Sequence, residues 1–182
     1  MAASAHADVK QFRSWDQSTI NDARLEDHTA PIMAPFRTKI ALAWSDTGEK
    51  LLGSSGIRIQ QLDTSGALEG QPILVPNTDT RRSPSLAIVG DRLWVAWIGS
   101  GDGEIYLARD NGPDKAGWER MPPPGKFSFS APALCDMGGM PGLFWRGNDS
   151  RVRMSSFIDV GGQASSNCLC RATFRWIRTY MP

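Results

Sequence analysis

Two short segments of this sequence place an aromatic side chain beside polar side chains that can bond hydroxyl groups. In the later segment, Trp145 is followed directly by Arg146-Gly-Asn-Asp149. In the earlier segment, Trp97 precedes a turn that carries Asp102 and Glu104. An aromatic face can stack on the C–H face of a sugar ring, while carboxylate, amide and guanidinium groups bond its hydroxyls. The sequence therefore predicts carbohydrate binding without catalysis, at a site formed by Trp97, Asp102, Glu104, Trp145, Arg146, Asn148 and Asp149.

The same residues also suit a purely structural role. Trp97 and Trp145 each follow an apolar residue by two positions, Val95 and Leu143 respectively, which puts each pair on one face of a strand. The polar residues that come next are Asp, Asn and Gly, the types that tight turns use most. The pattern favours core packing for the tryptophans and exposed turns for the polar residues, and it leaves ligand contact open for both.

Other kinds of site have little support in the sequence. Three cysteines, Cys135, Cys168 and Cys170, face only two histidines, His6 and His28, whereas a structural zinc site needs four ligands close together. No serine-triad motif surrounds either histidine, and no glycine-rich phosphate loop joins a strand to a helix. We therefore expect no metal, no cofactor and no catalytic residue.

The predicted site residues belong to a repeat of about fifty residues. Its copies open at Pro31, Pro84 and Pro132, with periods of 53 and 48 residues. A tryptophan stands 13 residues after each of these prolines, at Trp44, Trp97 and Trp145. Each tryptophan ends an apolar segment and is followed by a turn-rich stretch. One fixed offset in three copies indicates a structural repeat.

The second copy shows the elements of one repeat. Its four predicted strands are Pro84–Gly90, Leu93–Trp97, Ile105–Leu107 and Trp118–Met121. In the other copies, the third strand is expected to open at Leu51 and Val152. Four strands in 48 to 53 residues is the size of a β-propeller blade. The sequence therefore predicts an all-β, propeller-like fold with about three four-stranded blades.

The predicted organisation is an N-terminal segment followed by three blades. Residues 1–30 carry a stray outer strand, and residues 31–83, 84–131 and 132–182 form blades one, two and three, the last with a divergent C-terminal strand. Propellers close with about four to eight blades, so three leave the ring incomplete. The ring could be closed by a second copy, or the chain could be a truncated piece of a longer propeller. A monomer of packed sheets is a third possibility.

Motifs of the second copy match a known kind of repeat. The copy contains Ser83-Pro-Ser-Leu86, then Gly90-Asp-Arg-Leu-Trp-Val-Ala-Trp97, then an Ile-Tyr strand at Ile105. This pattern resembles the repeat of sialidase-like and Psathyrella-type lectin propellers, and the match extends over about residues 29–160. The resemblance implies a propeller that binds carbohydrate. A protein-interaction scaffold and a fragment of a sialidase-like glycoside hydrolase remain alternatives.

Composition limits the partners of this chain. Its 182 residues include 20 Lys and Arg against 19 Asp and Glu, and a net charge of +1 gives no reason to expect nucleic acid or an anionic membrane. No apolar run approaches the roughly 20 residues of a membrane helix. The N-terminus lacks a basic region followed by an apolar stretch, so we expect no secretory signal and either a cytoplasmic location or non-classical secretion. Glycans and a second copy of the chain are the expected partners.

Overall fold

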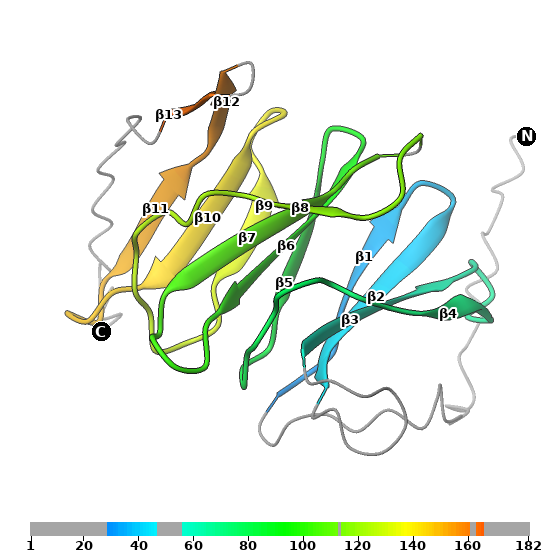
Figure 1. Ribbon diagram of the computed structural model, residues 1–182, viewed down its shortest axis with the longest axis horizontal. Helices are drawn as coiled ribbons and strands as arrows, with labels where there is room; N and C mark the ends of the chain where they lie inside the picture. Colours follow the sequence, from blue (N-terminus) through cyan, green and yellow to red (C-terminus); the bar gives the residue numbers. More distant parts are fainter. Residues whose placement is uncertain (1–28, 47–55, 113, 161–162, 166–182) are drawn as a thin grey trace, which may run out of the picture.

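The computed structural model describes residues 29–46, 56–112, 114–160 and 163–165, which contain β-strands and turns but no helix. The strands form three antiparallel sheets in chain order and one separate hairpin (Figure 1). Sheet I contains β1 (Ile32–Phe36), β2 (Lys39–Asp46), β3 (Gly56–Leu62) and β4 (Leu68–Leu74). Sheet II contains β5 (Ser85–Val89), β6 (Arg92–Ile98), β7 (Ile105–Asp110) and β8 (Trp118–Arg120). Sheet III contains β9 (Ala133–Asp136), β10 (Pro141–Arg146) and β11 (Val152–Ser156), and the hairpin contains β12 (Ile158–Val160) and β13 (Gln163–Ser165).

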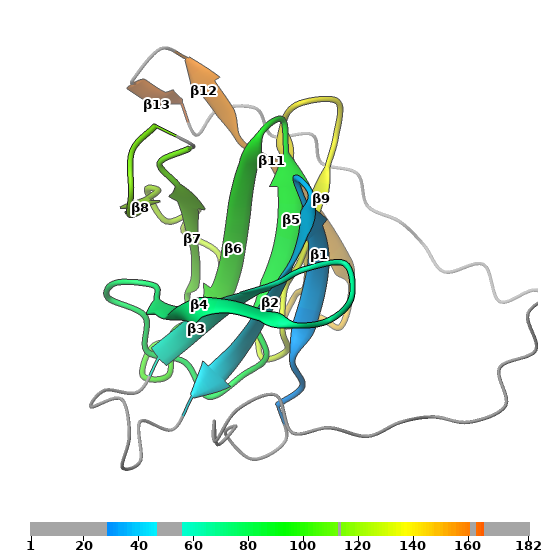
Figure 2. The same cartoon turned by 90° about the vertical axis from the view of Figure 1, so that its right-hand side faces the viewer.

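The sheets stand side by side, with their first strands adjacent. Strand β1 packs against β5, and β5 packs against β9. Figure 2 shows these three strands gathered on one side of the molecule, with β8 on the other. Within each sheet, consecutive strands pair as neighbours, so the chain moves outward through a sheet and returns to the inner side to begin the next. The all-β prediction is confirmed, whereas the described sheets form an open row and the propeller remains a prediction.

Two apolar layers hold the row together, and sheet II lies between them. Along β6, Leu93, Val95 and Trp97 belong to the cluster shared with sheet I, while Trp94 and Ala96 belong to the cluster shared with sheet III. Both faces of this strand are covered, which explains its nearly continuous apolar sequence. Burying about 200 Å² of an aromatic side chain contributes roughly 5 kcal/mol, so these tryptophans are major terms in packing.

The register of the sheets confirms the repeat. The three tryptophans occupy the same place in β2, β6 and β10, where their cross-strand partners are Arg58, Tyr106 and Arg153. Trp97 packs in the layer shared with the preceding sheet, and so does Trp145. Trp44 lies with Leu42 and Leu62 in a third buried cluster on the other face of sheet I. Each copy therefore presents its tryptophan on the corresponding face of its sheet.

Several predicted strands agree with the structure and others fall outside it. Strand β7 begins at Ile105 and β11 at Val152, as predicted. The third copy was expected to have four strands, but sheet III has three, and the following strands β12 and β13 form a hairpin of their own. The predicted strands at 12–15 and 172–180, the predicted opening at Leu51, and Cys168 and Cys170 lie outside the described residues. Among the residues that the structure does describe, no helix has the length and apolar character needed to cross a membrane.

Candidate functional site

The two tryptophans of the predicted site are core residues. The side chain of Trp97 is only 1% exposed and stacks on Tyr106, with 5.7 Å between the ring centroids. Trp145 is also buried, in the layer between sheets II and III. The packing role that the sequence favours is confirmed for both. Neither ring has an exposed face on which a ligand could stack.

Asp102 organises the hairpin between β6 and β7. Its carboxylate accepts a hydrogen bond from the backbone N–H of Glu104 at 2.9 Å and another from the Tyr106 hydroxyl at 2.5 Å. The Tyr106 hydroxyl and the Glu104 N–H hold the pKa of Asp102 below its usual value. The same bond to the carboxylate raises the pKa of Tyr106 to about 12. Asp102 is exposed, yet both carboxylate oxygens already bond within its own hairpin.

Asp149 does the equivalent work in the hairpin between β10 and β11. Its carboxylate accepts a bond from the backbone N–H of Arg151 at 3.2 Å and another from the Arg153 guanidinium at 3.0 Å. Partial burial acts to raise its pKa, but the Arg151 N–H and the positive charge of Arg153 outweigh that effect and lower the pKa. Arg146 donates to the Ser150 hydroxyl at 2.9 Å across the same turn. Asn148 is exposed at the tip.

One buried serine in the linker between β8 and β9 joins these two hairpins. The backbone N–H of Ser128 donates to the carbonyl of Gly103 at 3.1 Å, in the first hairpin. The Ser128 hydroxyl is 3.1 Å from the carbonyl of Arg146, at the start of the second hairpin. An isolated β-bridge pairs Glu104 with Phe127. The structure therefore brings Glu104 and Arg146, which are far apart in sequence, to opposite sides of one linker segment.

The same linker exposes two phenylalanines that the sequence analysis did not select. Phe127 is 54% exposed and Phe129 is 70% exposed, on either side of the buried Ser128. The alternation is inverted relative to a usual strand, with the hydroxyl inside and the aromatic rings outside. A Phe-Ser-Phe segment outside the repeated strands is the signal that could have found them. These two rings supply the aromatic surface that the buried tryptophans cannot.

The corresponding linker between sheets I and II has different chemistry. Counting back from the prolines that open the second and third copies, Asp79 and Arg81 stand where Phe127 and Phe129 stand. Asp79 bonds Ser100 of the neighbouring hairpin through its backbone and its side chain. The combination of exposed aromatic rings and polar hairpins is therefore specific to the junction of sheets II and III. We name this surface, formed by Glu104, Phe127, Phe129, Arg146 and Asn148, the linker site.

The described part of the chain contains no cluster of three or more His, Cys, Asp or Glu side chains that could hold a metal ion. Cys135 is half-buried in β9 and forms no disulfide with any described residue. At the linker site, Arg146 and Asn148 are exposed and Glu104 is half-buried, and these polar side chains are suited to hydrogen bonding, while the two rings are suited to stacking.

Comparisons with known proteins are sparse. No family model matches this chain, and no match is found among curated proteins. Among solved structures, an alpha-L-arabinofuranosidase from Lactobacillus brevis is similar, with a TM-score of 0.48 and 13% sequence identity. The match covers 74% of this chain and 54% of that one, so the chain spans about half the length of that structure.

Proposed function

We propose that this chain is a lectin-like, non-catalytic carbohydrate-binding protein whose ligand occupies the linker site. The observation that carries the proposal is the pair of exposed rings, Phe127 and Phe129, beside side chains that can bond hydroxyls. Exposing the apolar ring of a phenylalanine to water is unfavourable. Two exposed rings in one short segment are a feature that a binding partner would explain.

The linker site offers both contacts that a sugar needs. The phenylalanine rings can cover C–H faces, and burying this apolar area drives association. Backbone contacts join Glu104 to Phe127 and the Arg146 carbonyl to Ser128, so both residues adjoin the Phe-Ser-Phe segment. Their side chains can accept from and donate to hydroxyl groups. Asp102 and Asp149 shape the two hairpins in this proposal, because their carboxylates bond their own turns. The site is shallow, so each contact is expected to be weak.

A propeller arrangement supports the same proposal. The three sheets repeat one register, pack through tryptophan-bearing faces and place their first strands together, as blades of a propeller do. The motifs at Ser83–Leu86 and Gly90–Trp97, which resemble sialidase-like and Psathyrella-type lectin repeats, favour carbohydrate as the ligand class. We propose that a second copy completes the ring, which would present two linker sites and raise the apparent affinity through avidity.

The test is a glycan array probed with the full chain, followed by calorimetric titration of the best ligand against variants. Phe129→Ala is expected to weaken binding about tenfold, which corresponds to roughly 1.4 kcal/mol. Arg81→Ala changes the equivalent position of the other linker and is the matched control, with affinity expected to stay unchanged. Since Phe129 is exposed, its removal is expected to leave the fold intact, and circular dichroism checks this.

Other outcomes separate the alternatives. A featureless array together with a specific protein captured on immobilised chain, lost in Phe129→Ala, would replace the lectin proposal with the interaction scaffold. An arginine triad and a Tyr–Glu pair in the flanking coding sequence would favour a fragment of a sialidase-like hydrolase. Equal loss of glycan binding in Arg81→Ala and Phe129→Ala would remove the linker site from the proposal.

A further inference from the structure

A second concave surface lies far from the linker site, between sheets I and II. It is a cavity of about 500 Å³ that opens to solvent, within the range of roughly 300–1,000 Å³ that small-molecule sites occupy. Apolar side chains form much of its lining, among them Phe36, Ile59, Ile73, Leu93 and Trp118. Charged side chains complete the lining, and these are Arg37 in the turn after β1, Lys39 in β2, Glu69 in β4, Asp110 in β7 and Lys115 between β7 and β8.

An irregularity in sheet I adjoins this groove, which Ile59, Gln61, Glu69 and Gly70 help to line. The pairing of β3 with β4 shifts at Gln60, between the partners of Ile59 and Gln61. The buried Gln60 amide donates to the carbonyls of Glu69 and Gly70, at 2.7 and 3.1 Å, and so satisfies backbone groups that the bulge leaves unpaired. Gly70 has a φ of 69°, which a glycine adopts without strain. The bulge is therefore built into the sheet on this side of the groove.

Arg37 reaches into the groove from a strained backbone position. It occupies the turn between β1 and β2 with a φ of 58°. The corresponding turn of sheet II, between β5 and β6, has Gly90 at a φ of 62°. A side chain in this left-handed conformation costs about 1–2 kcal/mol, and such strain is a feature of functional positions. The turn would be more stable with glycine, so the side chain of Arg37 requires another explanation.

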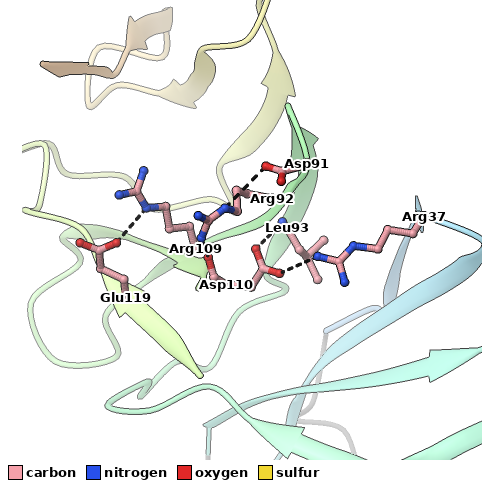
Figure 3. Close-up of polar contacts among 7 residues, drawn as sticks. All are labelled: Arg37, Asp91, Arg92, Leu93, Arg109, Asp110 and Glu119. Carbon is pink, nitrogen blue, oxygen red and sulfur yellow. Dashed lines mark hydrogen bonds and ion pairs between the residues drawn. The ribbon is translucent and has the colours of Figure 1, made fainter. Parts of the chain in front are cut away.

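The guanidinium of Arg37 has unused donors. Its side chain is 44% exposed and lies over the Phe36 ring, 4.5 Å from the centroid. Its nearest anionic partner is Asp110, at 3.9 Å, too far for a hydrogen bond (Figure 3). Asp110 is itself engaged with sheet II, because its carboxylate accepts from the Leu93 N–H at 2.9 Å. Arg37 donates no hydrogen bond to any described residue.

A second cation of the groove, Lys115, has no ionic partner among the described residues, whereas Arg37 has its long ion pair with Asp110. Lys115 lines the groove from the segment between β7 and β8, is exposed, and has no ion pair or hydrogen bond with a described residue. Lys39, by contrast, pairs with Glu69. The groove is lined by three cations, Arg37, Lys39 and Lys115, and by two carboxylates, Glu69 and Asp110. Because Glu69 pairs with Lys39 and Asp110 lies 3.9 Å from Arg37, one positive charge of the groove is left without a counter-charge.

We propose that this groove binds a small organic carboxylate with a flat apolar body. The apolar lining, including Trp118, covers the body of the ligand, and Arg37 receives the carboxylate. A guanidinium matches a carboxylate with two parallel N–H donors, and such charge-assisted bonds are about twice as strong as neutral ones. Lys115 adds a second positive charge. This site is separate from the linker site and takes a different class of ligand.

The test uses 4-methylbenzoate as the probe and its neutral isostere 4-methylbenzamide as the matched ligand. In ¹H–¹⁵N correlation spectra of the full chain, benzoate is expected to shift the Gly70 and Gly112 amides and the Trp118 indole. Benzamide is expected to bind at least tenfold more weakly. Raising the salt concentration should weaken benzoate binding alone, because only the charged ligand is screened.

Arg37→Gly is the informative variant, because it is expected to fold, so that a loss of binding can be attributed to the missing guanidinium. Glycine relieves the left-handed strain, so the denaturation midpoint should rise while benzoate affinity falls about tenfold. Arg109→Gln is the control, since Arg109 pairs with Glu119 and does not line the groove. Equal shifts with benzamide, unchanged benzoate affinity in Arg37→Gly, or shifts confined to other surfaces would each overturn the proposal.

Discussion

At the scale of single residues, exposed polar groups of this protein divide into those that build turns and those that remain available. Asp102 and Asp149 each cap a backbone N–H and also bond the side chain that pairs across from a tryptophan. These carboxylates hold the hairpin to the buried layer, so their role is structural even though water reaches them. Arg37 is the opposite case, because its guanidinium donates to no described residue.

The bond between Asp102 and Tyr106 predicts an unusual titration. Because folding raises the pKa of Tyr106 to about 12 from 10.0, the folded protein holds this proton more tightly than the unfolded chain. The stabilisation is complete below pH 10 and is lost as the pH rises through about 12. Absorbance at 295 nm in a Tyr180→Phe background, where Tyr106 is the remaining tyrosine, measures this pKa directly.

Asp102→Asn is expected to move the titration of Tyr106 back toward 10, since the carboxylate is the main cause of the shift. Asp91→Asn removes an exposed carboxylate of the same sheet and should leave the titration near 12. A Tyr106 that titrates at 10 in the unmodified background would show that the bond to Asp102 does not persist in solution.

The burial of the predicted tryptophans follows from the sequence, but the exposed rings do not. Period-two alternation puts Trp97 on the face of Val95, and the structure confirms that face as core. At the linker, hydrophobicity alone would place Phe127 and Phe129 inside and Ser128 outside. The structure has the reverse, because the buried Ser128 hydroxyl bonds the backbone carbonyls of Ser130 and Arg146, which a phenylalanine side chain cannot do.

At the scale of elements, the linkers between sheets form specific hydrogen bonds with the strands and hairpins beside them. Thr78, in the linker after β4, receives the Ile57 N–H at 2.9 Å through its hydroxyl and donates to the Val75 carbonyl at 2.8 Å. This ties the beginning of β3 to the end of sheet I. Gly56 lies directly under the contact, with a φ of 148°.

Gly56→Ala is therefore expected to destabilise the protein by about 3 kcal/mol or more. A Cβ there would lie 2.7 Å from the Thr78 hydroxyl and 2.8 Å from its carbonyl oxygen, and the backbone atom cannot move aside cheaply. Gly90→Ala is the matched control, because a Cβ at Gly90 meets no atom within 4 Å and only the left-handed backbone, worth about 1 kcal/mol, is affected. Urea denaturation of both variants measures the difference. Equal losses would mean that the linker does not approach β3 this closely.

Strand positions were predictable where turn residues mark them. Gly101-Asp-Gly103 precedes β7, and the Asn148-Asp149 turn precedes β11, so both strands begin where the sequence places them. The bulge at Gln60 could not be predicted, because its cause is a contact between a buried amide and carbonyls of the next strand. The adjoining groove is lined by residues of both sheets, so a local sequence pattern could not predict it either.

At the scale of the whole molecule, the outer face of sheet III differs from the corresponding faces of sheets I and II inside the row. The residue before each repeat tryptophan faces the following sheet, and it is a buried alanine at Ala43 and Ala96. Sheet III has Phe144 at this place, half-buried and paired across from Met154. At this place the outer face of sheet III therefore has larger apolar side chains than the corresponding faces of sheets I and II. A surface that packs against it must accommodate Phe144 where sheets II and III accommodate an alanine.

We expect the second copy that completes the ring to use this face. Light scattering on a size-exclusion column should give a mass near twice 19.9 kDa. Phe144→Glu should give 19.9 kDa with unchanged circular dichroism, because a charge on a half-buried outer face opposes association more than folding. Phe129→Glu, at the linker site, should leave the dimer intact. A monomeric unmodified chain would rule out closure by a second copy.

The repeated sheets could be predicted from the sequence, but whether they close into a ring could not. The fixed spacing from Pro84 to Trp97 and from Pro132 to Trp145 predicts repeated sheets, because the same register recurs in each. Ring closure depends on surfaces that meet only in the assembled molecule, and a local pattern contains no information about the angle between sheets.

The two inter-sheet linkers differ at their exposed positions and are alike at the buried position between them. Asp79 and Arg81 match Phe127 and Phe129 in position but not in chemistry. Between them, Thr80 and Ser128 have the same role, because each hydroxyl accepts a hydrogen bond from the backbone N–H two residues further on. In the proposed function, Phe127 and Phe129 bind the ligand while Ser128 between them supports the segment. At the other linker, the bond from the Ser100 N–H to the Asp79 carbonyl does not depend on the Asp79 side chain, whereas the Ser100 hydroxyl also bonds the Asp79 carboxylate. Under the proposal, grafting phenylalanine at 79 and 81 would remove that one side-chain bond and add a second pair of exposed rings to a single chain.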